Sequence, residues 1–252
     1  MILTNSNYFS KENNIKYMSA SQFKSFFLEC EAKALAEAKG DYVREKTKPM
    51  LVGSFVDAYF EGSLDDFKLE NPEIFKKDGG LKSDFRQAED IIARVQRDEF
   101  FMQFLSGQKQ VIKTGEIEGV LFKSKIDSYH EGRAIVDLKV MKDFSREWKD
   151  GLKISFIEKW GYDLQASIYV QLEGNNLPFF IAAVTKEKEP DLEIISIPRE
   201  RLDVCLDMVK KHVKRFDDIK KGLVEPTRCE KCNWCKSTKK LTEIISYEDI
   251  GE

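Results

Sequence analysis

The stretch RAIVDLKVMK, residues 133–142, constrains the fold more than any other part of the chain. Its many apolar side chains indicate a strand that is buried in a sheet. Asp137 and Lys139 interrupt that pattern, and because they lie two residues apart they share one face of the strand. Burying charges without partners is strongly unfavourable, so this face needs partners. The opposite face carries the side chains that we expect to pack into the core: Val136, Leu138 and Val140.

A second acid comes from the preceding strand. The segment 109–140 is typical of two strands, a turn at HEGR and a third strand. Folding this hairpin about Glu131–Gly132 places Asp127 opposite about residue 135 and diagonal to Asp137. Diagonal neighbours lie roughly 7–8 Å apart at Cα, which is within reach of one shared ion. The two acids can therefore point at the same place.

This charged face allows two interpretations. In the first, the hard carboxylate oxygens of Asp127 and Asp137 bind Mg²⁺ or Mn²⁺, and Lys139 orients an attacking water and stabilises charge on a phosphate oxygen. In the second, Asp137 and Lys139 form an internal ion pair at the end of a strand. The spacing alone does not separate these interpretations.

Helices are predicted before and after these strands. The first has a serine cap at Ser19 or Ser21 and ends at Gly40, and a later one is capped by Ser83 and ends at Gly107. The predicted helices cover 19–40, 49–62, 83–107, 155–173 and 199–222. Two further strands are predicted over 177–187 and 192–198. This order predicts an α/β or α+β fold, with a central mixed β-sheet flanked by helices.

The length of 252 residues suits a single large domain. We divide it into a helical N-terminal part over 1–108, a sheet core over 109–200, and a C-terminal helix with a cysteine segment over 201–252. The sequence contains no apolar run long enough to span a membrane, and its N-terminus lacks the pattern of a signal peptide. A cytoplasmic protein is therefore expected. The net charge of −3 excludes little, because a carboxylate-rich pocket can coexist with a basic groove.

The cysteines form a second chemical pattern. In a reducing compartment, five cysteines indicate metal binding or chemistry rather than disulfides. Cys229, Cys232 and Cys235 form C-x-x-C-x-x-C, a strong metal signal, and a closed site needs a fourth ligand. The candidates are Cys30 and Cys205, although Cys205 lies among apolar residues of a predicted helix, where a buried free thiol is usual. Reduced, metal-free thiols are the alternative.

Several motifs together carry a family resemblance. The segment GVLFKSKIDSYHEGRAIVDLKV resembles the core of the PD-(D/E)XK nuclease superfamily, in which one acid is followed on the next strand by acid-x-Lys. Gln165 and Tyr169 are similar to the Q-x-x-x-Y motif of the RecB-like and lambda-exonuclease-like branch. Gly53 and Asp57 resemble that branch's G-x-x-x-His, with Asp57 in place of the His. The chain resembles the phage-type PDDEXK-like exonucleases related to the RecE family over most of residues 18–240. A restriction-endonuclease-like core with a helical N-terminal arm is implied.

The resemblance implies a set of metal ligands. Asp127, Asp137 and the carbonyl of Leu138 would bind the ion, and Lys139 would position the nucleophile. A carboxylate can replace an imidazole on Mg²⁺, so Asp57 is either a further ligand or an acid on a helix surface.

The resemblance also implies supporting residues. Gln165 and Tyr169 lie at i and i+4 on one helix face, where they would bind the substrate phosphate or support the site. A half-packed helix surface is the simpler explanation of that pair. Glu116 lies where related exonucleases often have a glutamate near the metal, and Glu118 is its equal rival.

The early cysteine, Cys30, lies in a segment that carries a second family resemblance. The segment around Cys30 is similar to the N-terminal helix of iron–sulfur nucleases of the AddB and CRISPR-adaptation types. In those proteins one early cysteine and three late ones hold a [4Fe–4S] cluster, here Cys30 with Cys229, Cys232 and Cys235. The late cysteines are more closely spaced in this chain, and four thiolates also suit Zn²⁺.

The activity implied by the resemblance is Mg²⁺-dependent hydrolysis of DNA by an exonuclease of the phage recombination or repair type. A catalytically inactive nucleic-acid-binding module and a structure-specific endonuclease of the same fold are the alternatives. DNA is the expected partner, with a single-strand annealing protein and a second copy of the chain as further candidates. A bacterial host, with or without a phage or prophage, is the implied setting.

Overall fold

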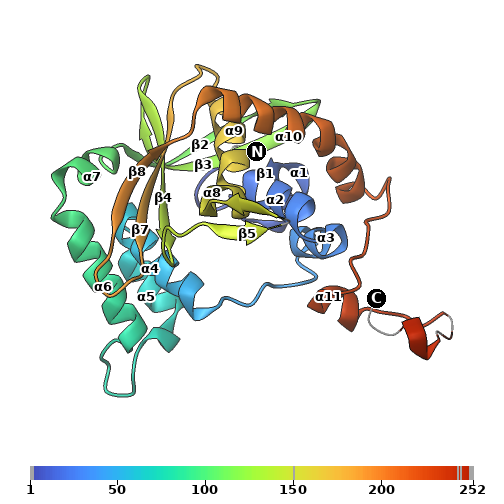
Figure 1. Ribbon diagram of the computed structural model, residues 1–252, viewed down its shortest axis with the longest axis horizontal. Helices are drawn as coiled ribbons and strands as arrows, with labels where there is room; N and C mark the ends of the chain where they lie inside the picture. Colours follow the sequence, from blue (N-terminus) through green and yellow to red (C-terminus); the bar gives the residue numbers. More distant parts are fainter. Residues whose placement is uncertain (1–2, 150, 243, 245, 250–252) are drawn as a thin grey trace.

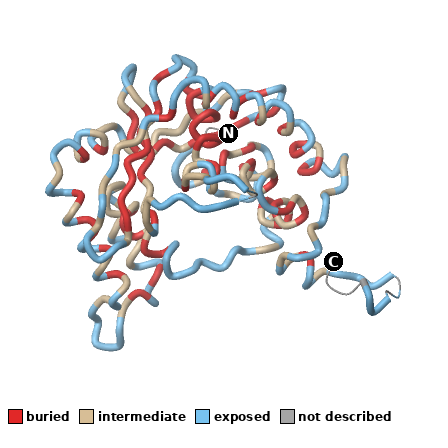
Figure 2. The backbone as a smooth tube through the Cα atoms, viewed as in Figure 1, coloured by how far each residue is buried: buried red, intermediate tan, exposed pale blue. Residues whose placement is uncertain are grey.

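The computed structural model describes residues 3–149, 151–242, 244 and 246–249. A mixed sheet lies between two groups of helices, as predicted, and its strands form the most buried part of the molecule (Figures 1 and 2). Among the described helices, none has the length and apolar character needed to cross a membrane.

The elements come in runs of helices and runs of strands. The helices are α1 Lys11–Lys16, α2 Ala20–Leu28, α3 Glu31–Lys39, α4 Lys48–Glu61, α5 Leu64–Glu70, α6 Ser83–Gln96, α7 Glu99–Phe104, α8 Phe156–Lys159, α9 Tyr162–Glu173, α10 Arg199–Lys220 and α11 Asn233–Ser237, with short 3₁₀ turns at Pro72–Ile74 and Tyr247–Asp249. The strands are β1 Met18–Ser19, β2 Gln108–Ile117, β3 Val120–His130, β4 Ala134–Met141, β5 Glu147–Lys149, β6 Leu152–Ile154, β7 Phe179–Thr185 and β8 Leu192–Ser196.

The long strand β3 has three strand partners. β2 pairs antiparallel with it along one edge. Two strands share the other edge: β1 pairs with Phe122 and Lys123, and β4 pairs with residues 128–130. Between them, residues 124–127 of β3 have no partner on that edge among the described strands, so the sheet forks there. β4 continues past this fork and pairs in parallel with β7.

The register of the β3–β4 hairpin differs from the prediction. Tyr129, rather than Asp127, pairs with Ile135. The reason is the turn, which has three residues between the strands and a left-handed Gly132 with φ 65°. If the same register is continued, Asp127 comes to lie opposite Asp137 rather than diagonal to it.

Strand β4 is buried on both faces. Val136 and Leu138 belong to an apolar core with α4 and α6, and Val140 packs against it. Ile135 and Met141 belong to the core on the other face, with α2, α9 and α10. The strand is therefore buried in the sheet, as predicted. Asp137 lies on the same face as Ile135 and Met141, between them along the strand.

The predicted helix over 19–40 is two helices. Ser19 caps α2 with a reciprocal capping box, and the left-handed Gly40 ends α3, as predicted. Between them Glu29 leaves the helical region (φ −117°, ψ −107°), and Cys30 becomes the N-cap of α3. This break turns Cys30 toward the C-terminal segment.

Two further predicted helices are also broken. Within 83–107, Asp98 ends one helix and caps the next by accepting a hydrogen bond from the Phe101 N–H at 2.9 Å. Ser83 is the first residue of α6 rather than its cap, and α7 ends before Gly107. Within 155–173 the break is Gly161, with φ 61°. Elements α1, α5 and the β5–β6 hairpin were not predicted.

Candidate active site

Two side chains satisfy the backbone groups left free at the fork. Asp127 lies in the gap, where its Oδ2 accepts a hydrogen bond from the Leu138 N–H at 3.1 Å. The Tyr169 hydroxyl donates to the Lys125 carbonyl at 3.2 Å from helix α9. A buried backbone group without a partner would be costly, so both contacts help to keep the fork open. Of the two predicted roles for Tyr169, this contact fits support of the site.

Asp137 and Lys139 face helix α9, where Gln165 meets them. Asp137 is only 3% exposed, and its Oδ1 accepts a hydrogen bond from Gln165 Nε2 at 2.7 Å. Lys139 is in close ionic contact with Asp137, and it donates to the Leu138 carbonyl at 3.1 Å. Burial disfavours the Lys139 ammonium, but Asp137 and Asp127 outweigh it and raise the pKa of this group. Asp127 and Asp137, which are predicted to bind a metal, thus already stabilise the positive charge of Lys139.

Helix α2 brings in a lysine that sequence reasoning missed. Lys24 Nζ donates to Gln165 Oε1 at 3.1 Å. Lys24 and Lys139 lie 4.8 and 5.1 Å from the centre of the Tyr162 ring. Burial, reinforced by the charge of Lys139, lowers the pKa of Lys24 to about 8. No motif marks Lys24, because only the packing of α2 on α9 brings it to the site.

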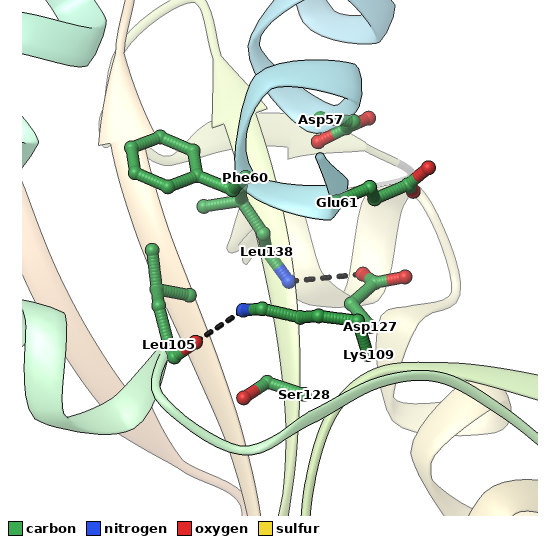
Figure 3. Close-up of a pocket in the computed structure, with 8 residues that line it drawn as sticks. All are labelled: Asp57, Phe60, Glu61, Leu105, Lys109, Asp127, Ser128 and Leu138. Atoms are coloured by element: carbon green, nitrogen blue, oxygen red, sulfur yellow. Dashed lines mark hydrogen bonds between the residues drawn. The ribbon is translucent and has the colours of Figure 1, made fainter. Parts of the chain in front are cut away.

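A hollow opens on the other side of the fork (Figure 3). It spans about 240 Å³ of space that is partly open to solvent, and α4 presents Asp57 and Glu61 to it from successive turns. The Asp57 Oδ1 atom is buried and has no hydrogen-bond partner among the described residues. Glu61 was not predicted, although its position four residues after Asp57 is a signal that could have found it. The hollow is lined by Asp57, Phe60, Glu61, Leu105, Lys109, Asp127, Ser128 and Leu138.

These acids raise one another's pKa values. Burial, with the nearby charges of Glu61 and Asp137, raises the pKa of Asp57 to about 7 against the opposing effect of Lys139. Burial and the charge of Asp137 raise the pKa of Asp127 well above its ordinary value. A buried cluster of hard oxygen donors, with one oxygen left unpartnered, is a chemical fit for Mg²⁺ or Mn²⁺.

Glu116 does not come to this site. It is exposed, and it pairs with Leu121 near the far end of the β2–β3 hairpin. Asp127 lies six positions further along β3, which corresponds to roughly 20 Å at the usual rise of a strand. Its rival Glu118 is exposed in the turn of the same hairpin. The further acid that does line the hollow is Glu61 of α4, which an argument from strand register could not identify.

Four cysteines meet at the other end of the molecule. The sulfur atoms of Cys30, Cys229, Cys232 and Cys235 all lie within 4.8 Å of one another. Backbone N–H groups at Lys231 and Cys232 lower the pKa of the Cys229 thiol to about 6, which favours a thiolate. Cys205 is buried separately in α10. Cys30 is therefore the fourth member of the set, as the resemblance implied.

Comparison with known proteins agrees with these features. Residues 19–238 match the model of a family described as a PDDEXK-like domain of unknown function (DUF3799). The chain belongs to this PDDEXK-like family. A crystal structure of a protein named “Putative exonuclease” from Eubacterium rectale is 47% identical, with a TM-score of 0.95 over 100% of this chain and 98% of that one. No curated protein matches the sequence. Membership of the PD-(D/E)XK superfamily and a restriction-endonuclease-like fold, both predicted, are thus confirmed.

Proposed function

We propose that the protein is a metal-dependent nuclease that hydrolyses phosphodiester bonds in DNA. The observation that carries this proposal is the meeting of Asp127, Asp137 and Lys139 at the fork, beside the unpartnered buried oxygen of Asp57. This set combines hard oxygen ligands with a cation that can stabilise a phosphate. A structural ion pair alone would not explain why Asp57 is aimed into the same hollow.

Each residue has a role that follows from its contacts. Asp57, Asp127, Asp137 and the Leu138 carbonyl would hold the ion. When bound, Mg²⁺ or Mn²⁺ supplies Lewis acidity at the scissile phosphate and makes a bound water more acidic. The Lys139 ammonium would orient the attacking water and stabilise charge on a phosphate oxygen.

Two residues of α9 support this arrangement. Gln165 fixes Asp137 through its 2.7 Å hydrogen bond, and Tyr169 holds the fork open through the Lys125 carbonyl. No residue needs to form a covalent bond to the substrate.

We infer that the DNA is degraded from an end. The similarity to the Eubacterium rectale protein named “Putative exonuclease” supports this choice, as does the resemblance to the RecE-related branch. A phage recombination or repair setting, with an annealing protein as partner, follows from that resemblance alone. A structure-specific endonuclease and an inactive binding module remain the competing functions.

The test uses linear, nicked and circular duplex DNA with Mg²⁺ or Mn²⁺. We expect loss of the linear DNA only, and no loss with Asp137→Asn, a change that keeps side-chain shape. Asp207→Asn alters an acid that is 79% exposed on α10 and serves as the matched control. Full activity of Asp137→Asn would contradict the site. Cleavage of circles would favour the endonuclease, and binding without cleavage of any substrate would favour the inactive module.

We further propose that the four cysteines hold a single Zn²⁺ ion. Zinc–sulfur bonds of about 2.3 Å in a tetrahedron place the sulfurs about 3.8 Å apart. The 3.6 Å separation between the Cys30 and Cys235 sulfurs, within a set that spans at most 4.8 Å, supports this geometry. A [4Fe–4S] cluster binds each thiolate to a different iron, so its ligands stand further apart.

Metal analysis of protein purified without oxygen tests this choice. One zinc per chain, with no visible absorbance from a cluster, is expected. Four irons with matching sulfide would support the [4Fe–4S] alternative, and the absence of both metals would reject the metal site. A protein with Cys30→Ala should bind zinc at least about tenfold more weakly.

A further inference from the structure

Two exposed tryptophans lie in the chain segment that leads from one element of the candidate active site to another. Trp148 is 74% exposed and Trp160 is 51% exposed, and the chain has three tryptophans in all. Both lie between β4, which carries Asp137, and α9, which carries Gln165. Large aromatic side chains left in water often mark a binding surface, because their burial by a partner is strongly favourable. The segment is exposed along most of its length (Figure 2).

Each tryptophan is accompanied by a lysine. Trp148 pairs directly with Lys153 across the β5–β6 hairpin, so the two side chains share one face. Lys159 Nζ lies 5.2 Å from the centre of the Trp160 ring. Lys149 adds an exposed cation, and neither it nor Lys153 has an ion-pair partner among the described residues. This surface therefore offers aromatic faces together with positive charge.

Aromatic contacts fix this surface relative to the site. Phe144 stacks on Phe156 with ring centres 5.7 Å apart, and Phe156 meets Tyr162 at 6.3 Å. Tyr162 in turn faces Lys139, at 5.1 Å. Lys159 connects α8 to the hairpin, because its ammonium pairs with Glu147 of β5 at 2.6 Å while it covers Trp160. In Figure 1 the hairpin accordingly lies near the centre of the molecule, close to α8.

We propose that Trp148 and Trp160 form a base-stacking surface for the single-stranded part of a nucleic-acid substrate. Unpaired bases expose their faces to aromatic side chains, whereas bases in a duplex are covered by their neighbours. Lys153 contacts the phosphates beside Trp148, and Lys149 adds positive charge from the other face of the hairpin. The charge of these lysines favours a nucleic acid over the apolar surface of a protein. This inference deepens the proposed function and rests on it.

Binding measurements with a catalytically inactive background test the surface. In Asp137→Asn protein, the affinity for a short fluorescent single strand is compared before and after Trp148→Ala plus Trp160→Ala. We expect the double change to weaken single-strand binding at least about tenfold, and duplex binding less than about twofold. Replacing both by Phe should recover most of the affinity, because a phenyl ring still stacks. Phe100→Ala removes an aromatic residue that is 62% exposed on α7 and serves as the matched control.

Each remaining outcome is decisive. Unchanged single-strand affinity, or equal losses for single strand and duplex, would overturn the stacking surface. Dissociation of a wild-type oligomer by the tryptophan changes, measured by sedimentation, would also overturn it in favour of a protein interface. Binding is measured without hydrolysis, so the two proposals can fail separately. If the tryptophan changes weaken single-strand binding but the wild-type protein degrades no DNA, the proposed function is contradicted and the stacking surface is not.

Discussion

At the scale of single residues, Asp57 distinguishes a metal site from an ion pair. Its buried Oδ1 lacks a hydrogen-bond partner among the described residues, and burial with neighbouring acids raises its pKa to about 7. Burying a carboxyl oxygen without a hydrogen-bond partner lowers the stability of the metal-free protein. The proposed ligand role would account for this acid, since a divalent cation would satisfy the oxygen.

The first prediction therefore concerns Asp57. Asp57→Ala should lower the rate of DNA hydrolysis at least about tenfold, the effect of losing even an outer partner of a metal ligand. Asp57→His restores the residue type found in the family motif, and it should recover more activity with Mn²⁺ than with Mg²⁺, because imidazole suits transition metals better. Initial rates with each metal provide the measurement. Asp65→Ala, at an exposed acid of α5, should have no effect, and equal rates for it and Asp57→Ala would show that Asp57 is not a ligand.

At the scale of elements, two buried lysines attach the N-terminal residues to the rest of the fold, one from β3 and one from α10. Lys123 of β3 contacts the Tyr8 carbonyl and donates to Asn14 Oδ1 at 2.9 Å. Lys220 of α10 donates to the Tyr17 carbonyl at 2.7 Å. Their depth in the protein has an electrostatic cost, because burial lowers the pKa of Lys123 to about 8 and that of Lys220 to about 7.

The second prediction is the pH dependence that follows from Lys220. Its pKa falls from 10.5 in the unfolded chain to about 7, so between these values the unfolded state binds more protons than the folded state. The free energy of unfolding should thus rise with pH above about 7, by at most about 1.4 kcal/mol per unit from this group. The part of the rise that comes from Lys123, whose pKa is about 8, should persist in Lys220→Met, and only the part from Lys220 should be lost. Lys214→Met, at an exposed lysine of the same helix, should retain the whole rise in urea unfolding measured at several pH values.

The helices and strands themselves were predicted to different extents from sequence patterns. Alternation and cap residues predicted the strands β2 to β4, β7 and β8 and the helix α10 almost to their ends. They did not predict the breaks at Cys30, Asp98 and Gly161. The break at Asp98 comes with a local cap that the sequence could have shown, whereas tertiary neighbours meet the chain at the other two. A side chain on Gly161, for example, would come within 3.0 Å of Leu28.

At the scale of the whole molecule, the site was predictable where its residues belong to an ordered motif. Asp127, Asp137, Lys139 and Gln165 meet as expected. Glu116 does not, because strand register placed it about a hairpin's length away. Lys24 was missed because packing alone brings it in, and Glu61 because its helical spacing from Asp57 was not used. The cysteine set followed from spacing plus resemblance, since composition could not choose between Cys30 and Cys205.

That cysteine set joins two distant parts of the chain. Cys30 at the start of α3 meets the three cysteines near α11, and Glu31 reinforces the junction by pairing with Arg215 at 2.7 Å and accepting the Thr227 N–H at 2.7 Å. A metal held by these four cysteines would bind the folded state in preference to the unfolded chain, so its binding free energy would add to stability. Among the described residues after α10, Cys235 is the one that is buried, so little else holds this segment to the fold by packing.

The third prediction compares two buried cysteines. Cys30→Ala and Cys205→Ala each remove one buried thiol, but only the first removes a member of the set. With metal present, Cys30→Ala should lower the free energy of unfolding by at least about 2 kcal/mol more than Cys205→Ala. After chelation the two losses should become equal, because the metal term disappears from both proteins. Urea unfolding of both variants, with and without chelator, gives the four values, and hydrogen exchange over residues 224–240 should quicken only when the metal or Cys30 is lost. If the excess cost of Cys30→Ala persisted after chelation, packing at the start of α3, rather than a bound ion, would hold the two parts together.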